Sequence, residues 1–265
     1  MKSKLMHLLQ ASCLLLLTFV SNLAVAEVIH VAAASNFTAP MKQIVKEFEQ
    51  ISGHKVRLAF GASGKFFAQI QHGAPFQVLL SADQAKPLAL EQAGYTVAQS
   101  RFTYAIGALA LWSVKPNFKV EDASVLSQGA FNKLALANPK LAPYGLAAVE
   151  VLEKLSLKET TRSKWVQGEN IAQTYQFTGT GNADLGFVSL SQILVNGQIK
   201  QGSAWIIPDN FHRPIRQDAV LLKRGENSEA AQALIRFIKS EQAKKIIKAY
   251  GYQTPAQERQ TEIKS

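Results

Sequence analysis

The sequence predicts an α/β protein of two lobes, each a mainly parallel sheet flanked by helices, with two hinge strands between the lobes. Short apolar runs rich in β-branched residues alternate with segments of helical spacing, and this alternation occurs in two separate blocks. Such alternation favours parallel strands covered by helices on both faces. The length, 265 residues, is close to that at which one hydrophobic core divides into two.

The N-terminus carries the pattern of a cleavable signal peptide. Lys2 and Lys4 precede an apolar run over 13–20, which is too short to remain as a membrane-spanning helix. Small residues follow this run, as a cleavage site requires. We therefore expect residues 1–26 to be removed, leaving an exported chain that begins at Glu27.

Composition narrows the functional classes. Cys13 is the only cysteine and lies within the expected signal peptide, so the exported chain has no disulfide or thiolate chemistry. The formal charge of +10 falls to +8 without Lys2 and Lys4, and the remaining basic residues are scattered. They form no stripe interleaved with aromatic residues, so nucleic acid is not an expected partner. The histidines of the exported chain show no metal-ligand spacing.

The first block of the exported chain reads as strand, helix, strand, helix, strand. Apolar residues recur at helical spacing from Phe37 to Phe48, and Gly53 marks the end of that helix. This βαβαβ unit implies a parallel sheet. The expected elements are a strand at 28–34, a helix from 36 to 53, a strand at 56–60, a tight turn at 61–64, a helix at 65–72 and a strand at 78–80.

The second block repeats this order of strands, turns and helices. One helix is expected to carry four leucine and valine residues on a single apolar face: Leu146, Val149, Leu152 and Leu155. A further helix begins near Ile171. The chain ends in two amphipathic helices. Strands are expected at 108–114, 134–137, 183–188 and 219–222.

Two extended stretches, 104–107 and 215–218, bracket the second block. They are the candidate hinge strands, because the chain passes there from one block to the other and back. The first lobe is accordingly predicted to consist of 27–105 with 217–265, and the second lobe of 106–216.

Two serines occupy matching places in the first block. Ser35 and Ser63 each stand between an expected strand and an expected helix, at the carboxyl ends of strands, where ligands of open α/β sheets bind. A serine there offers a hydroxyl, and the helix that follows offers free amides and the positive end of its dipole. The pair suits an anion without any Lys or Arg. The alternative is that both serines are ordinary helix N-caps.

Several motifs occur in the order in which a known family carries them. They are Ala32–Ser35, Phe60–Ser63, Gly73–Pro75, Leu80–Gln84, Asn138–Pro139, Pro143–Gly145, Ala183–Val188 and Pro214–Val220. Over nearly the whole exported chain, the sequence resembles the periplasmic molybdate-binding proteins of ATP-binding cassette importers, a type II periplasmic solute-binding family. The resemblance implies the two-lobed periplasmic binding protein fold, whose cleft closes on a ligand.

The resemblance also implies, position by position, which groups hold the ligand. Ser35 and Ser63 would bind an oxyanion through hydroxyl and amide groups, and the backbone amides of Tyr144 and Ile171 would complete the cage. Some family members have a tyrosine in contact with the ligand where this chain has Ser189. With the shorter side chain the hydrogen bond is lost, or water replaces it, or the lobes close further, so Ser189 is a candidate additional contact. No catalytic residue, no cofactor and no direct protein ligand to a metal is implied.

The ligand that the family implies suits a cage made only of donors. Molybdate and tungstate are fully deprotonated at neutral pH, whereas phosphate keeps a proton that needs an acceptor, and the four positions provide no carboxylate. Sulfate matches in charge but is smaller. The predicted function is therefore capture of molybdate or tungstate in the periplasm by a monomer, and delivery to the inner-membrane permease of an ATP-binding cassette importer.

Two other functions stay open at this stage. One is a binding protein for another anion, namely sulfate, phosphate or an organic acid, and Arg213 and Arg216 near the expected hinge would suit an organic acid. The other is a secreted serine hydrolase built on Ser63. Lys65 stands where a nucleophile elbow needs glycine. A lysine two residues along a helix also points away from the serine.

Overall fold

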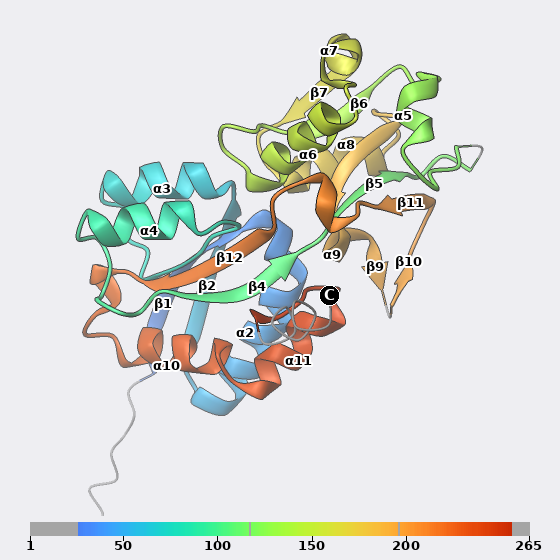
Figure 1. The fold of residues 1–265 in the computed structure, drawn as a ribbon. Coiled ribbons are helices and arrows are strands. Elements are labelled where there is room, and N and C mark those ends of the chain that lie inside the picture. Colours follow the sequence, from blue (N-terminus) through green and yellow to red (C-terminus); the bar gives the residue numbers. More distant parts are fainter. Residues whose placement is uncertain (1–25, 117, 196, 256–265) are drawn as a thin grey trace, which may run out of the picture.

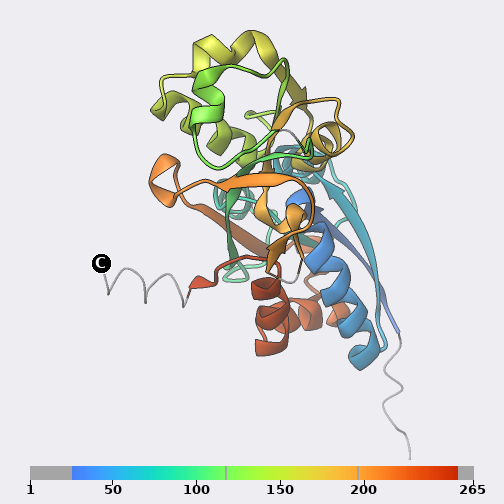
Figure 2. The same ribbon diagram turned by 90° about the vertical axis from the view of Figure 1, so that its right-hand side faces the viewer.

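The computed structural model describes residues 26–116, 118–195 and 197–255. All of the predicted signal peptide except Ala26 lies outside the described residues, so its cleavage stays a prediction. Figure 1 shows two lobes, each built on a five-stranded sheet with helices around it, and Figure 2 shows one lobe above the other. The predicted two-lobed α/β architecture is confirmed. No helix in the described part of the chain is long and apolar enough to cross a membrane.

The first sheet has the strand order β2-β1-β3-β12-β4. Its strands are β1 (Val28–Ala34), β2 (Lys55–Gly61), β3 (Val78–Leu80), β4 (Phe102–Gly107) and β12 (Ile215–Leu221). β1 pairs in parallel with β2 and β3, while β12 lies antiparallel between β3 and β4. Four of these five strands therefore run in one direction, and the strands predicted in the first block are confirmed.

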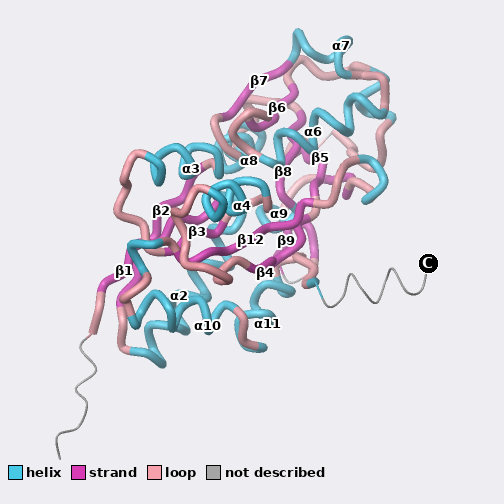
Figure 3. The backbone as a smooth tube through the Cα atoms, turned by 60° about the vertical axis from the view of Figure 1, so that its left-hand side comes forward, coloured by secondary structure: helices cyan, strands magenta, loops and turns pink. Residues whose placement is uncertain are grey.

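Helices cover both faces of the first sheet. α2, α10 and α11 pack on one face, and α3 and α4 pack on the other (Figure 3). Gly53, in the left-handed conformation at φ 72°, ends α2 where the sequence predicted. The helices of this lobe are η1 (Ser35–Phe37), α2 (Thr38–Ser52), α3 (Ser63–Gln71), α4 (Ala85–Gln92), η4 (Lys223–Gly225), α10 (Glu229–Ile238) and α11 (Glu241–Ala249).

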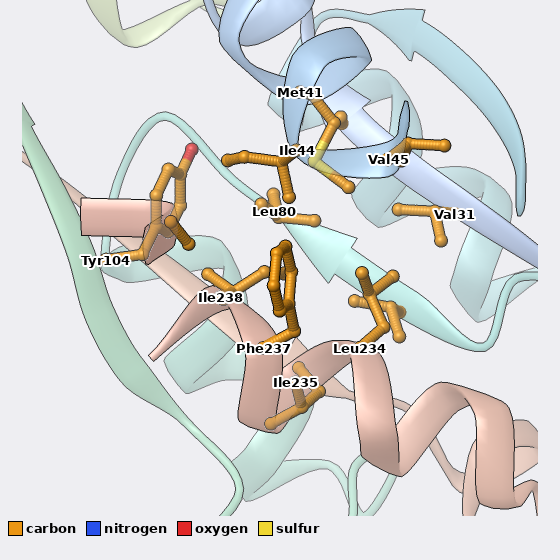
Figure 4. Close-up of a cluster of buried hydrophobic side chains, with 14 of the residues drawn as sticks. Val31, Met41, Ile44, Val45, Leu80, Tyr104, Leu234, Ile235, Phe237 and Ile238 are labelled. Carbon is orange, nitrogen blue, oxygen red and sulfur yellow. The ribbon is translucent and has the colours of Figure 1, made fainter. Parts of the chain in front are cut away.

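The larger core of the first lobe lies between the sheet and α2, α10 and α11 (Figure 4). Val31 and Leu80 from the sheet share it with Met41 of α2 and Leu234 of α10, and all four side chains are fully buried. Their burial excludes water from the faces that strand and helix spacing marked as apolar. This packing holds the carboxyl ends of β1, β2 and β3 at one edge of the lobe.

The second sheet has the strand order β11-β5-β8-β6-β7. Its strands are β5 (Leu109–Ser113), β6 (Leu134–Ala137), β7 (Trp165–Gly168), β8 (Leu185–Ser189) and β11 (Ser203–Ile206). β6 is parallel to β7 and β8, while β5 lies antiparallel between β8 and β11. β7 and β11 were not predicted, because each is a short, partly buried strand that mixes polar or glycine residues with apolar ones, whereas the equally short β6 is a continuous apolar run.

The helices of the second lobe are short apart from two. They are α5 (Ser124–Gln128), α6 (Pro143–Lys154), α7 (Lys158–Thr161), η2 (Arg162–Lys164), α8 (Ile171–Gly179), α9 (Leu190–Ile193) and η3 (Asp209–Phe211), and a hairpin of β9 (Leu194–Val195) and β10 (Gln198–Ile199) follows α9. Val149 and Leu152 of α6 are buried as predicted, but Leu146 is 41% exposed. The prediction for Leu146 was wrong because α6 presents the small side chains of Ala147 and Ala148 to the core, and Leu146 lines a groove between the lobes.

The chain crosses between the lobes at two adjacent places. β4 ends at Gly107 and β5 begins at Leu109, and the chain returns through the segment between β11 and β12. β4 and β12 are antiparallel neighbours, with Ile215 opposite Gly107 and a register shift between Gln217 and Asp218. The stretches predicted as hinges are thus paired strand ends of the first sheet, next to the second lobe (Figure 1).

Asp184 anchors the start of β8 in the second lobe. Its carboxylate accepts hydrogen bonds from the amides of Asn132 and Lys133, at 2.7 and 2.9 Å, and pairs with the ammonium of Lys115. Burial alone raises the pKa of the Asp184 carboxyl, but the hydrogen bonds from Lys115 and the two amides outweigh it and hold that pKa below its ordinary value.

Replacing Asp184 by Asn should lower the free energy of unfolding near neutral pH by about 2 kcal/mol, because hydrogen bonds to a charged acceptor are lost. Since the folded-state pKa is depressed, the carboxylate stabilises the fold above the unfolded pKa of about 3.9. That contribution disappears as the pH falls through the folded pKa. Urea unfolding from pH 7 to pH 3 should show the two proteins converging in acid. Asp209→Asn, at an exposed aspartate of the same lobe, is the control, and a pH-independent gap for Asp184→Asn contradicts the prediction.

Candidate functional site

The four site residues predicted in the first block and the second block line one cavity between the lobes. The cavity is small and takes Ser35 and Ser63 from the first lobe and Tyr144 and Ile171 from the second. The full lining is Ala34, Ser35, Asn36, Gly61, Ala62, Ser63, Ala82, Ala142, Pro143, Tyr144, Asn170 and Ile171.

The cavity lies at the carboxyl ends of strands from both sheets. β1 ends at Ala34 and β2 at Gly61, in parallel and directly paired, so that the residues after them emerge side by side. In the second lobe, β6 and β7 end in register at Ala137 and Gly168, shortly before the residues that line the cavity. This is the edge where open α/β sheets bind their ligands.

Ser35 and Ser63 are not N-caps, so the alternative of ordinary capping serines is wrong. Each is the first residue of a helical segment, and the cap positions before them are Ala34 and Ala62. An alanine side chain cannot accept a hydrogen bond from the first amides of the helix. The amides at the starts of η1 and α3 therefore have no side-chain cap, although their helix ends face a cavity.

The N-terminus of α6 reaches the cavity in the same way. Its cap residue is Ala142, which offers no side-chain acceptor, and Pro143 at the first helical position has no amide hydrogen. The amide of Tyr144 is thus the first that α6 can present. Gly145 allows this close approach, because a Cβ there would lie 2.1 Å from the carbonyl oxygen of Ala137 at the end of β6.

The N-terminus of α8 differs because it is capped. The Asn170 side-chain oxygen accepts hydrogen bonds from the amides of Ala172 and Gln173, at 2.9 and 3.1 Å. The cap does not take the amide of Ile171, the first residue of the helix, and Ile171 lines the cavity. The four helical segments that begin at the cavity therefore bring backbone amides and dipole ends of the same sign to one place.

The two serine hydroxyls are held by protein contacts. The Ser63 hydroxyl oxygen accepts a hydrogen bond of 2.9 Å from the amide of Ala82, which leaves the Ser63 proton to donate elsewhere. The Ser35 hydroxyl donates to the Asn170 side-chain oxygen at 3.3 Å, across the boundary between the lobes. Both serines are almost fully buried. Both hydroxyls are neutral and lie at the edge of the space between the lobes, where the Ser63 proton is free to donate and the Ser35 proton is given to Asn170.

Further contacts close the lobes over this space. The amide of Gly64 donates to the carbonyl oxygen of Leu141 at 2.9 Å, and Lys65 pairs with Glu169 at 3.0 Å outside the cavity. Among the described residues that line the cavity, none carries a formal charge. A tetrahedral anion would meet hydroxyl and amide donors on several sides and would meet no carboxylate.

Ser189 does not line the cavity, unlike the other predicted site residues. It caps α9: its side chain accepts a hydrogen bond from the backbone amide of Gln192 in a reciprocal capping box, and its hydroxyl lies 2.9 Å from that of Ser191.

Asn36 and Asn170 do line the cavity but were not predicted. Asn36 directly follows Ser35, and Asn170 directly precedes Ile171, so position beside a predicted residue was the only sequence signal for either.

The arginines considered for an organic acid lie elsewhere. Arg213 and Arg216 line a separate groove between the lobes, and this groove shares only Ala82 and Pro143 with the serine cavity. The guanidinium of Arg213 is paired with the carboxylate of Glu150. The serine cavity therefore has no arginine among its described lining residues.

The chain is similar to known proteins in both sequence and structure. The profile of a family described as "Bacterial extracellular solute-binding protein" matches residues 29–253. The chain is 54% identical over 229 residues to the molybdate-binding protein ModA of Azotobacter vinelandii, covering 86% of this chain and 91% of the relative. It is 47% identical over 231 residues to ModA of Rhodobacter capsulatus, covering 87% and 90%. The solved structure of the periplasmic molybdate-binding protein of Azotobacter vinelandii matches with a TM-score of 0.83 at 39% identity, over 86% of this chain and 99% of that chain.

Replacing Gly145 by Ala should destabilise the protein by about 1–3 kcal/mol, because the added methyl group overlaps the Ala137 carbonyl and forces the backbone apart. Gly179→Ala, at the end of α8, is the matched control, since its Cβ would meet the nearest atom, of Trp112, at an ordinary 3.5 Å. Thermal unfolding of both variants checks this. Equal melting temperatures for the two variants contradict the close approach.

Proposed function

The chain belongs to the bacterial extracellular solute-binding proteins, and on that premise we propose that it captures molybdate and tungstate for delivery to the membrane permease of an ATP-binding cassette importer. The observation that carries this proposal is the cavity of neutral donors: uncapped helix N-termini and two serine hydroxyls surround a small space that has no carboxylate in its described lining. The relatives with 54% and 47% identity, both named molybdate-binding proteins, support the same ligand.

We assign the four sides of the oxyanion to four residues. The hydroxyls and amides of Ser35 and Ser63 bind it from the first lobe, and the amides of Tyr144 and Ile171 bind it from the second. The bond from the Ala82 amide to the Ser63 hydroxyl oxygen supports this role, because it orients the serine proton away from Ala82. The molybdenum atom is held only through its oxygens, with no direct bond to the protein and no cofactor.

The absence of a carboxylate from the described lining also argues for a ligand that carries no proton. Molybdate, tungstate and sulfate carry no proton at neutral pH, and every oxygen can accept a hydrogen bond. Phosphate retains a proton at neutral pH, and this proton would lack a carboxylate acceptor and leave a buried donor unpaired, which costs about 1–3 kcal/mol. The smaller sulfate would leave some donors too distant to form full hydrogen bonds.

Binding is proposed to proceed by closure of the two lobes, 27–105 with 217–265 and 106–216. The ligand first meets Ser35 and Ser63, and the second lobe then brings the amides of Tyr144 and Ile171. Closure follows binding because a ligand that touches both lobes has its full set of contacts only in the closed form. Paired strand ends at the two crossings, in β4 and β12, would absorb the rotation.

The proposed function requires that the chain be exported and fold as a binding unit outside the cytoplasm. We propose that residues 1–26 act as a signal peptide and that the chain works as a monomer in the periplasm, where its permease partner is accessible. The family description is extracellular, and the relative of known structure is itself described as periplasmic.

The relatives are solute-binding proteins, and we propose that this chain has no catalytic activity. Lys65, the residue considered as a partner for a serine nucleophile, pairs with Glu169 at 3.0 Å. The Ser63 hydroxyl oxygen accepts the Ala82 amide. Ester or amide hydrolysis by the purified protein, abolished in Ser63→Ala, would contradict this view.

A panel of oxyanions tests the ligand. The mature protein should gain thermal stability with molybdate and with tungstate, by about 2.7 kcal/mol at a ligand concentration one hundred times the dissociation constant. Sulfate and phosphate at the same concentration should produce a much smaller gain. Thermal-shift assays and calorimetry measure this. Stabilisation by sulfate, phosphate or an organic acid with none by molybdate would show that the ligand is wrong.

Ser35 and Ser63 should each contribute to the affinity for molybdate. Ser35→Ala and Ser63→Ala remove a hydrogen bond to a charged ligand, so each should raise the dissociation constant for molybdate about tenfold to a hundredfold. Ser240→Ala is the control, because Ser240 caps α11 far from the cavity and its loss should reduce stability alone. Titration calorimetry measures the dissociation constant of each variant. If molybdate affinity is unchanged in both Ser35→Ala and Ser63→Ala, the assignment of these serines to the anion is wrong.

A further inference from the structure

The hydroxyl of Tyr144 reaches a buried polar network at the hinge. Its amide belongs to the helix start that faces the cavity, but its ring is 1% exposed and its hydroxyl accepts a hydrogen bond from the side chain of Gln217 at 3.2 Å. Gln217 is fully buried in β12, one of the two strands at the crossing. One residue therefore reaches both the ligand site and the hinge.

This hydrogen bond joins the two lobes. Tyr144 belongs to α6 of the second lobe, and Gln217 belongs to the first sheet. The other bonds of Gln217 stay inside the first lobe: its side-chain oxygen accepts from Asn36 at 2.8 Å and from the hydroxyl of Tyr104 at 3.0 Å. The bond between the Tyr144 hydroxyl and Gln217, here called the latch, is thus the one of these three that opening must break.

The network ties the latch to the ligand-binding edge of the first lobe. Asn36 lines the cavity directly after Ser35, and its side chain donates to Gln217 and to the hydroxyl of Tyr252. The hydroxyl of Ser191, from the second lobe, donates to the carbonyl oxygen of Asn36 at 2.9 Å. The cavity and this network therefore share Asn36 and Tyr144, one from each lobe.

Gly107 makes room for the latch at the crossing itself. A Cβ at this position would lie 1.9 Å from the Tyr144 hydroxyl oxygen and 2.7 Å from the Gln217 side-chain nitrogen. The phenol thus rests against the last residue of β4 with no space for a methyl group. Opposite Gly107 in the register stands Ile215, the first residue of β12. The phenol is inserted where the two strands leave the first lobe.

We propose that Tyr144 is a positioning residue for closure: its phenol, bonded to Gln217 against Gly107, holds the second lobe at the angle at which its own amide reaches the anion. This inference rests on the proposed function, because it concerns how the same site retains its ligand. The latch forms only when the lobes are closed, so it acts on release of the anion more than on capture. A side chain that keeps every contact except the hydroxyl should close on the ligand but hold it less long.

The Tyr144 phenol keeps one protonation state over the pH range in which the protein works. Burial, followed by the influence of the nearby Tyr252, raises the pKa of the Tyr144 phenol well above its ordinary value. The phenol is therefore neutral throughout the range in which the protein is folded and binds. Its contribution to release should not vary between pH 6 and pH 8.

Tyr144→Phe tests the latch, with radiolabelled molybdate as the probe and full-length mature protein. The release rate, measured by chase with excess unlabelled molybdate, should rise about tenfold, while the association rate changes less than about twofold. Tyr104→Phe is the matched control, because its buried hydroxyl also bonds Gln217 but lies entirely within the first lobe, with Ser81 as its second partner. Its release rate should stay within about twofold of the unmodified protein.

A second variant, Gly107→Ala, disturbs the latch through the strand residue against which the Tyr144 phenol packs. Gly107→Ala places a methyl group against the phenol oxygen in the closed form, so it should also speed release. Because both changes act on one contact, Gly107→Ala combined with Tyr144→Phe should speed release by less than the product of the two separate effects.

The outcomes separate the latch from the proposed function. Unmodified protein that fails to bind molybdate overturns both. Normal binding with a Tyr144→Phe release rate within twofold of the unmodified protein overturns the latch alone. Equal acceleration in Tyr104→Phe also overturns it, because the effect would then come from loosening Gln217 inside the first lobe. Faster release confined to Tyr144→Phe and Gly107→Ala supports it.

Discussion

The space between the lobes depends on one constraint: backbone amides at the start of a helix have no partner within the helix, and when buried they must find one. A side-chain N-cap usually accepts hydrogen bonds from such amides. Three of the helix starts around this cavity have no side-chain cap, since Ala34, Ala62 and Ala142 occupy the cap positions. Alanine at a cap costs a helix about 1 kcal/mol relative to Ser or Asp. In the proposed function, an anion in this cavity accepts hydrogen bonds from amides at these helix starts and so offsets that cost.

The same constraint explains why the site is divided between two lobes. Parallel strands bring their carboxyl ends to one edge, so each sheet can direct only its own helix starts toward a ligand. Two sheets facing each other supply donors from opposite sides, and the set is complete only when the lobes close. Interlobe bonds such as that from Gly64 to Leu141 hold the closed arrangement, and the Tyr144 phenol reaches from the closed site to the crossing strands. Under the proposed function, Tyr144 thereby links anion binding to the position of the second lobe.

Much of this architecture followed from local patterns. β1, β3 and β6 lie where runs of apolar residues predicted them, and α2 ends at Gly53, because periodicity and a left-handed glycine are properties of short segments. β11 escaped prediction because it is short and only partly buried, so it forms no continuous apolar run of the kind that marks β6. Leu146 was misplaced because apolar character does not reveal that α6 buries Ala147 and Ala148 instead.

By itself, the sequence determined that two serines follow strands at the starts of helices, that the chain crosses twice between lobes, and which family its motifs resemble. Only the tertiary structure decided that Ser35 and Ser63 are first helical residues behind alanine caps, that Ser189 turns away to cap α9, and that the Tyr144 phenol meets Gln217. The physical reason is that these contacts join residues far apart in the chain. Their partners are chosen by how the two lobes pack, which no spacing within a segment encodes.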